Sequence, residues 1–222
     1  MAITLQDIER RFASQLNRWE DTPEDNNRAS AVAKDWSVFG DDDRISWFIA
    51  RVIRYYLVSI EQSSGAPFPC AAYQCALIDT LGGYAYYESC KKEGGRPGEV
   101  TSEAFRRFLK EYYPPPFRAN GEGWFYSVFR CGILHALASP SIGLGGDELV
   151  ADIAELRYQL RDASGGLSLD QGVPKERAVW ALNIHYFRNS TLDATLRYLE
   201  NLASGAPEIR RNFLKRHRDT FR

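Results

Sequence analysis

The chain has 222 residues, of which 44% are hydrophobic and 26% charged, a composition typical of a globular protein with its own hydrophobic core. Its 28 basic and 29 acidic residues leave a formal charge of -1, which excludes a chain coated with positive charge for non-specific nucleic-acid binding. A local basic groove is still compatible with this balance, because arginine outnumbers lysine and its planar guanidinium clamps phosphate.

No segment has the pattern of a secretion signal or a membrane anchor. Residues 2–20 are amphipathic and charged, without the apolar core of a signal peptide, and no run approaches the roughly 20 apolar residues of a membrane span. The cysteines form no CxxC pair, so buried reduced thiols are expected rather than disulfides or a zinc site. They are Cys70, Cys75, Cys90 and Cys131. These features predict a cytoplasmic protein without a metal or cofactor.

The first half of the chain predicts helices separated by polar or proline-rich loops. Residues 2–20 place apolar side chains on one helical stripe. A helix over residues 42–62 has aspartates at its start, where a helix N-terminus favours negative charge. A third helix covers residues 70–92. A fourth, over residues 101–113, begins with a capping-box pattern and is closed by three prolines.

The helix over residues 70–92 consists mainly of small and apolar residues, and one acid, Asp79, lies among them. It also contains the pair Gly82 and Gly83, which weakens a helix because glycine loses the most backbone freedom on folding. Such a pair predicts either the close approach of a second helix or a bend.

The second half predicts a helix over about residues 123–138, followed by a change of period. Apolar residues alternate with polar ones on both sides of a DASGG turn, which indicates a small β-hairpin near residues 155–169; a helix over 147–162 is the alternative. A long helical pattern over residues 173–204 follows, opened by Pro174, with an interruption near Asn189 and Ser190 as the alternative to one continuous helix. Residues 207–221 predict a final basic helix.

Together these elements predict an all-α fold, a helical bundle with additional N- and C-terminal helices, in a single domain spanning residues 1–222. The expected core consists of apolar residues on the helical stripes. They are Leu77, Ile78, Tyr84, Phe105, Phe108, Leu109, Phe125, Phe129, Ile133, Leu134, Trp180, Ile184, Leu192, Leu196 and Leu199.

The run WFYSVFRCGILHALA, residues 124–138, is almost wholly apolar yet contains Arg130 and His135. Burying either group is costly without a partner, so the two either form structural pairs or belong to a site. A histidine titrates near neutrality and can take a proton from a ribose hydroxyl and return one to a leaving group. An arginine can hold and neutralise the phosphate between them. The pair would suffice for metal-free cleavage of RNA, whose 2′-hydroxyl DNA lacks.

Other interpretations of these residues compete with a site. Residues five apart on an ideal helix lie about 140° apart, so Arg130 and His135 need the reach of the arginine, a helix bend or a second protomer to meet. A structural interpretation pairs Arg130 with an acid such as Asp79 and His135 with a backbone carbonyl. The run RNFLKRH, from Arg211 to His217, is a rival motif, but its charged terminal helix predicts a solvated face.

The segment FYSVFRCGILHALA resembles the RCG-[LI]-[LIV]-H segment of HEPN-domain proteins, a helical superfamily defined by an R-x4-6-H motif. The upstream helix YQCALIDTLGGYAYY is similar to the helix that such proteins place before the motif, including its acid. The hairpin-like stretch and the later segment ALNIHYFRNSTLDATLRYLENL are similar to the end of the same domain. The resemblance covers about residues 67–203.

This resemblance implies a four-helix-bundle core over about residues 67–203 and a homodimer in which the two motifs face each other. Many members are metal-independent endoribonucleases of bacterial defence, toxin–antitoxin and CRISPR-linked systems. The resemblance also implies that Arg130 binds phosphate and that His135 is the general base or acid. It further implies that Asp79 is a supporting acid that orients one of these two residues. The implied partners are RNA, a second copy of the chain, and an antitoxin or defence-system protein.

Some members of the superfamily are not enzymes, so the alternative function is a binding module that holds RNA, a nucleotide or a protein partner without turnover. The chain also departs from two familiar patterns. Cys131 stands where a polar asparagine is frequent, and Leu137 stands where nucleotidyltransferase-paired toxins have tyrosine.

Overall fold

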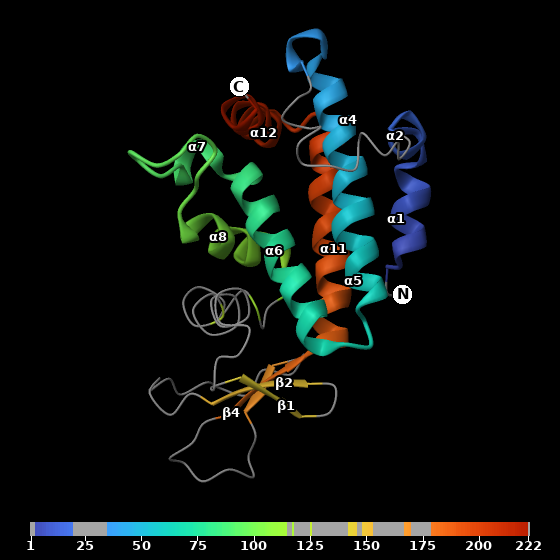
Figure 1. The fold of residues 1–222 in the computed structure, drawn as a ribbon, viewed down its shortest axis with the longest axis vertical. Coiled ribbons are helices and arrows are strands. Elements are labelled where there is room, and N and C mark those ends of the chain that lie inside the picture. Colours follow the sequence, from blue (N-terminus) through green and yellow to red (C-terminus); the bar gives the residue numbers. More distant parts are fainter. Residues whose placement is uncertain are drawn as a thin grey trace.

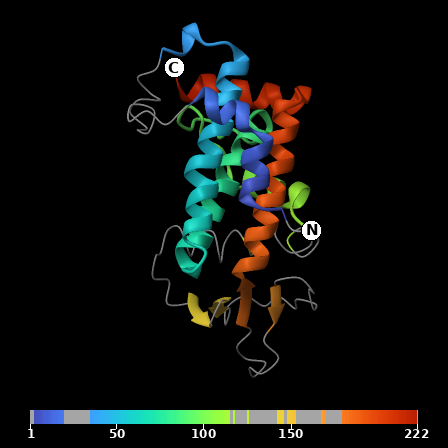
Figure 2. The same cartoon turned by 90° about the vertical axis from the view of Figure 1, so that its right-hand side faces the viewer.

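A computed structural model gives the fold of the protein. It describes residues 3–19, 35–114, 117, 125, 142–145, 148–152, 167–169 and 179–221. The main body is helical, as predicted, with long helices along the long axis and a small sheet at one end (Figures 1 and 2). Within those ranges no helix combines the length and hydropathy needed to cross a bilayer.

The N-terminal helices cover one side of the body. The predicted helix over residues 2–20 is divided at buried Phe12 into α1 (Leu5–Arg11) and α2 (Ala13–Arg18). The predicted helix over 42–62 is confirmed as one continuous helical run. It consists of α4 (Asp41–Arg51), a π-helical segment (Val52–Leu57) and α5 (Val58–Gln62), and a short 3₁₀ turn (Trp36–Val38) precedes it.

The glycine pair marks a close helix–helix contact in the centre of the body. It lies in α6 (Pro67–Ala85), which a short helix α7 (Tyr87–Cys90) follows, and α8 (Ser102–Tyr112) crosses α6. A Cβ atom on Gly82 would lie 2.5 Å from the carbonyl oxygen of Ala104 in α8. Of the two alternatives that the glycine pair predicts, a close approach and a bend, the close approach is therefore confirmed.

Gly82→Ala should reduce the free energy of unfolding by about 1–3 kcal/mol, because a methyl group there meets backbone, which cannot move aside as a side chain can. Denaturant unfolding followed by circular dichroism measures this change. Gly65→Ala is the matched control, since a Cβ at that position has nothing within 4 Å. An unchanged midpoint for Gly82→Ala would contradict the contact between α6 and α8.

The C-terminal helices are α11 (Ile184–Ala203), which runs beside α4 and α5, and α12 (Pro207–Thr220), which crosses one end of the body (Figure 2). Arg216 of α12 fastens this helix to α6. Its guanidinium lies 4.5 Å from the ring centroid of Tyr84, and its Nη1 donates to the carbonyl of Thr80 at 2.9 Å. A side chain on Gly83 would collide with that guanidinium, so the second glycine of the pair makes room for α12.

The strands form one antiparallel sheet of order β1-β2-β4-β3 at the end of the bundle opposite α12. They are β1 (Ile142–Gly145), β2 (Glu148–Asp152), β3 (Leu167–Leu169) and β4 (Val179–Asn183). The sheet is peripheral, so the helical class of the body stands.

Two predictions in this region were wrong. The helix predicted over residues 173–204 begins only at Ile184, because Val179–Asn183 pairs with β2 and the Asn183 side chain then caps α11 by accepting from the Tyr186 amide at 2.9 Å. The alternative helix over 147–162 is contradicted by β2.

Of the predicted hairpin near 155–169, the second half is confirmed as β3, which pairs with β4. Its first strand lies outside the described residues. So does the predicted helix over 123–138, apart from Phe125.

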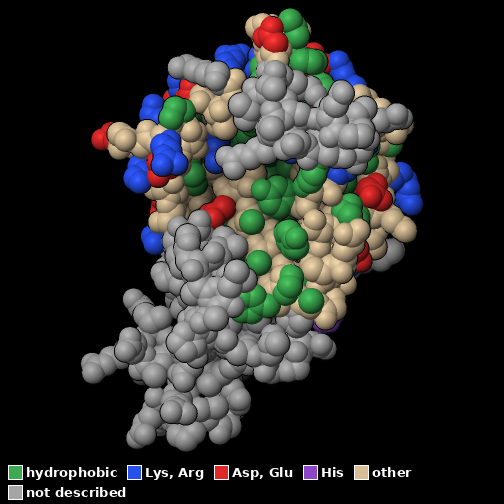
Figure 3. Space-filling model, viewed as in Figure 1, with side chains coloured by type: hydrophobic (Ala, Val, Ile, Leu, Met, Phe, Trp, Pro, Cys, Tyr) green, Lys and Arg blue, Asp and Glu red, His purple; other side chains and the backbone are tan. Residues whose placement is uncertain are grey.

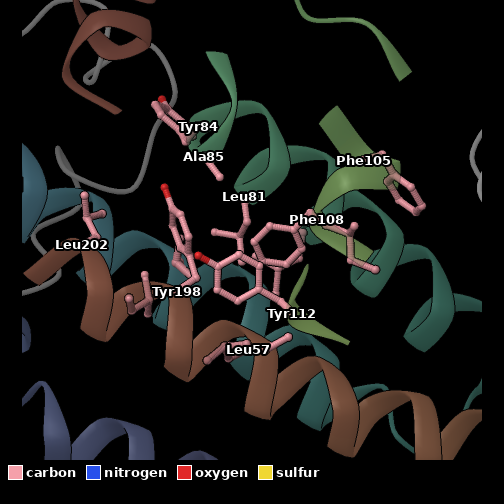
Figure 4. Close-up of a cluster of buried hydrophobic side chains, with 14 of the residues drawn as sticks. Leu57, Leu81, Tyr84, Ala85, Phe105, Phe108, Tyr112, Tyr198 and Leu202 are labelled. Carbon is pink, nitrogen blue, oxygen red and sulfur yellow. The ribbon is translucent and has the colours of Figure 1, made fainter. Parts of the chain in front are cut away.

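The core is built from aromatic and aliphatic side chains that extend from Ile8 of α1 to Leu214 of α12, and Figure 4 shows part of it. Most of the predicted core residues are buried: Leu77, Ile78, Tyr84, Phe105, Phe108, Leu109, Phe125, Ile184, Leu192 and Leu199. Leu196 is only partly buried and packs against the cluster. The side chains of Phe129, Ile133, Leu134 and Trp180 lie outside the described part of the chain.

Candidate functional site

Of the three predicted site residues, the structure describes Asp79. Arg130 and His135 lie outside the described residues. Asp79 is half-buried on α6, three residues before Gly82. Residues three and four apart are neighbours on a helix surface, so Asp79 lies on the side of α6 that carries both Gly82, which faces α8, and Gly83, which faces Arg216 of α12.

The beginning of the RCGILH-containing segment is anchored in the core by Phe125, which is fully buried. Its ring centroid lies 5.3 Å from that of Phe187 on α11 and 6.3 Å from that of Phe105 on α8. Phe105 directly follows Ala104, the α8 residue that meets α6. The anchor of the motif segment therefore lies beside α8, the helix that meets α6 at Gly82.

The rival motif RNFLKRH is not a site, because its histidine is part of the core. The prediction of a solvated face was wrong for His217, which is fully buried on the same side of α12 as Phe213. Aromatic rings surround it, and the centroid of its ring lies 4.5 Å from Trp36 and 4.7 Å from Phe221. Arg211 is exposed, so the two ends of that motif do not share a cleft.

The environment of His217 also prevents its imidazole from exchanging protons near neutral pH. Burial, followed by the positive charge of Arg44, lowers the pKa of His217 to about 3. The Nη1 of Arg44 lies 3.3 Å from the Nδ1 of His217, and arginine only donates, so Nδ1 accepts and the ring proton sits on Nε2. The neutral imidazole cannot serve as a general acid at pH 7.

The described part of the chain contains no group of three or more His, Cys, Asp or Glu side chains placed to hold a metal ion. Cys70, Cys75 and Cys90 are buried free thiols, and burial raises the pKa of the Cys70 thiol. The predicted burial is thus confirmed for three of the four cysteines, and Cys131 lies outside the described residues.

Comparisons of the chain with protein-family models, with curated proteins and with solved structures find no match. The resemblance to HEPN-domain proteins therefore rests on the sequence motifs alone.

Proposed function

We propose that the protein is a metal-independent endoribonuclease of the HEPN type, in which the ribose 2′-hydroxyl attacks the adjacent phosphate. Arg130 binds the phosphate and stabilises the negative charge that develops on it, and His135 moves the protons. The observation that carries this proposal is the RCGILH segment, where one arginine and one histidine interrupt an apolar helical pattern.

The other two histidines support the choice of His135. His217 is buried and neutral. His185 is exposed at the start of α11, and the nearby Arg188 is engaged by Glu61, with Nε 3.0 Å from Oε2. His135 is the remaining histidine, and it follows Arg130 at R-x4-H spacing.

The placement of Asp79 and Phe125 supports a role for the acid. Arg130 follows Phe125 by five residues, a length of chain that reaches at most about 18 Å. Phe125 packs on Phe105 of α8, and Gly82, three residues after Asp79, meets Ala104 of the same helix, so a chain of this length is compatible with an approach of Arg130 to the carboxylate. In this proposal Asp79 orients Arg130 or His135 and is a positioning residue.

The proposed active form is a homodimer in which the two motif segments face each other, since a two-fold partner completes a cleft and excludes water from it. The proposed setting is bacterial defence, with an antitoxin or another defence-system protein as the partner that restrains cleavage.

The purified chain should cleave a labelled single-stranded RNA in excess EDTA and leave the DNA of the same sequence intact, because the nucleophile is the 2′-hydroxyl and the proton carrier is a side chain. Gel electrophoresis of the products measures both. Cleavage that requires added magnesium would contradict the mechanism. Saturable RNA binding without cleavage would instead support the binding module.

A further inference from the structure

A polar network of buried side chains crosses the core of the protein between three helices. It consists of Tyr113 at the end of α8, Thr191 on α11 and Gln74 on α6, and each of these residues is at most 1% exposed. Lys, Arg, Asp and Glu side chains lie at the surface of the described part of the molecule (Figure 3). Polar groups inside the core are the informative exception, because removing them from water costs free energy unless they are hydrogen-bonded.

The groups of the polar network are hydrogen-bonded to one another. The hydroxyl of Tyr113 donates to Oγ1 of Thr191 at 2.9 Å. That oxygen lies 2.9 Å from Oε1 of Gln74 and 2.8 Å from the carbonyl oxygen of Phe187, which share its proton. The amide nitrogen of Gln74 in turn donates to Sγ of Cys70 at 3.3 Å. A buried network that is satisfied in this way fixes one relative arrangement of the helices that it joins.

The polar network contacts the aromatic rings that hold the beginning of the motif segment. Between ring centroids, Tyr113 lies 5.4 Å from Phe117 and 6.0 Å from Phe187. The same two rings flank Phe125, at 5.7 Å and 5.3 Å. Thr191 also bonds to the backbone of Phe187, one helical turn away. The network therefore contacts the rings around Phe125 at two points, through Tyr113 and through Thr191.

At its other end the polar network is attached to α6, the helix that bears Asp79. Gln74 precedes Asp79 by five residues on that helix. The network thus connects α6 with the anchor of the segment that contains Arg130 and His135, the two parts of the chain that would form the proposed site. A displacement of about 1 Å between reacting groups can lower a rate by about 100-fold, so the proposed reaction needs a fixed distance between these parts.

We infer that Tyr113, Thr191 and Gln74 are positioning residues, whose hydrogen bonds fix the motif segment relative to α6. This inference rests on the proposed function for its effect on cleavage, whereas the order of the segment is measurable without cleavage. Replacing both partners of a buried hydrogen bond by apolar groups of the same shape can leave stability nearly unchanged, so stability alone does not require these hydroxyls. Their contribution is directional, because a hydrogen bond constrains angle as well as distance.

The first test measures amide hydrogen exchange by mass spectrometry in the full-length protein without RNA. Tyr113→Phe keeps the ring and removes the hydroxyl. Exchange in the peptide that contains Phe125 should become about 2-fold to 10-fold faster, the factor that one buried hydrogen bond represents. A peptide from α4 is the internal reference, since a loss of global stability would accelerate both. Tyr87→Phe is the matched control, because it removes a tyrosine hydroxyl bond of 2.9 Å that lies outside the network, to Asp219 of α12.

The second test separates the hydroxyl of Thr191 from its volume. Thr191→Val keeps the shape and removes the hydroxyl, whereas Thr191→Ser keeps the hydroxyl and removes a methyl group. Exchange at Phe125 should accelerate in Thr191→Val and stay closer to the wild type in Thr191→Ser. In cleavage assays Tyr113→Phe and Thr191→Val should lower kcat by up to about 100-fold and leave KM unchanged, because they disturb the alignment of the reacting groups rather than RNA binding.

Equal exchange at Phe125 in Tyr113→Phe and in the wild type would overturn the inference. A larger effect of Thr191→Ser than of Thr191→Val would overturn it too, since the volume of Thr191 would then matter and its hydroxyl would not. The two Thr191 variants decide the question if Tyr113→Phe fails to fold. A wild-type chain that does not cleave RNA would overturn the proposed enzyme activity, and hydrogen exchange would still decide whether the network positions the segment.

Discussion

His135→Ala should lower the rate of RNA cleavage by about 100-fold to 10,000-fold, the usual contribution of a general acid–base residue. Without the imidazole, the 2′-hydroxyl must lose its proton to water and the leaving oxygen must take one from water. Single-turnover rates with a labelled RNA measure the loss. Arg130→Lys should also lose much of the activity, because lysine keeps the charge but not the planar fork that grips phosphate.

His185→Ala is the matched control for this prediction. His185 is exposed on the first turn of α11, so removing it should leave both the fold and the cleavage rate close to those of the wild type. His217 is unsuitable as a control, because its loss would open a hole in the aromatic core. A wild-type rate in His135→Ala, with cleavage lost in His185→Ala, would move the site to the start of α11.

The titration of His217 should by itself lower the free energy of unfolding by about 1.4 kcal/mol for each pH unit below about 6.5. The folded pKa of this histidine is lowered to about 3, whereas the unfolded chain takes up the proton near the ordinary value. Unfolding therefore binds a proton between these two pH values, and stability is lost as the pH falls through that window. Burial is the main cause. Arg44 and then Arg218 add to it, and Asp41 opposes them.

Urea unfolding of the wild type and of His217→Phe, each at pH 7 and pH 5, isolates this contribution. The variant keeps an aromatic ring among Trp36, Trp47 and Phe221 but cannot titrate. Its stability should decline less than that of the wild type between the two pH values, because the remaining carboxylates are common to both. Equal declines would show that His217 is protonated in the folded protein.

Strongly periodic segments of the sequence predicted their helices well. The 42–62 helix followed from local pattern, since it depends on residues near each other in the chain, and the glycine pair marked a close approach without identifying its partner, Ala104 of α8. The start of α11 could not be found in the same way. Val179–Asn183 continues an apolar pattern that fits a helix equally well, and only its pairing with β2, far away in sequence, selects the strand.

The burial of His217 could not be predicted from the local sequence either. Its neighbours in sequence, Arg216 and Arg218, are charged, so the local composition indicated a solvated helix. The burial of the histidine depends on two tryptophans that come more than 100 residues earlier in the chain, Trp36 and Trp47. Tertiary packing of this kind has no local signature.

The candidate site itself remains a sequence prediction at Arg130 and His135, and the structure adds the position of Asp79 and the anchor at Phe125.

The most direct test of the central claim uses an RNA in which one nucleotide, at the mapped cleavage position, carries a 2′-deoxyribose. In excess EDTA the unmodified RNA should be cut there and yield a 2′,3′-cyclic phosphate end, detectable by mass spectrometry. The substituted RNA should bind with the same affinity and remain intact at that position, because the nucleophile is missing. Cleavage of the substituted RNA at the same phosphate would mean that water or a protein group attacks, and would contradict the mechanism assigned to Arg130 and His135.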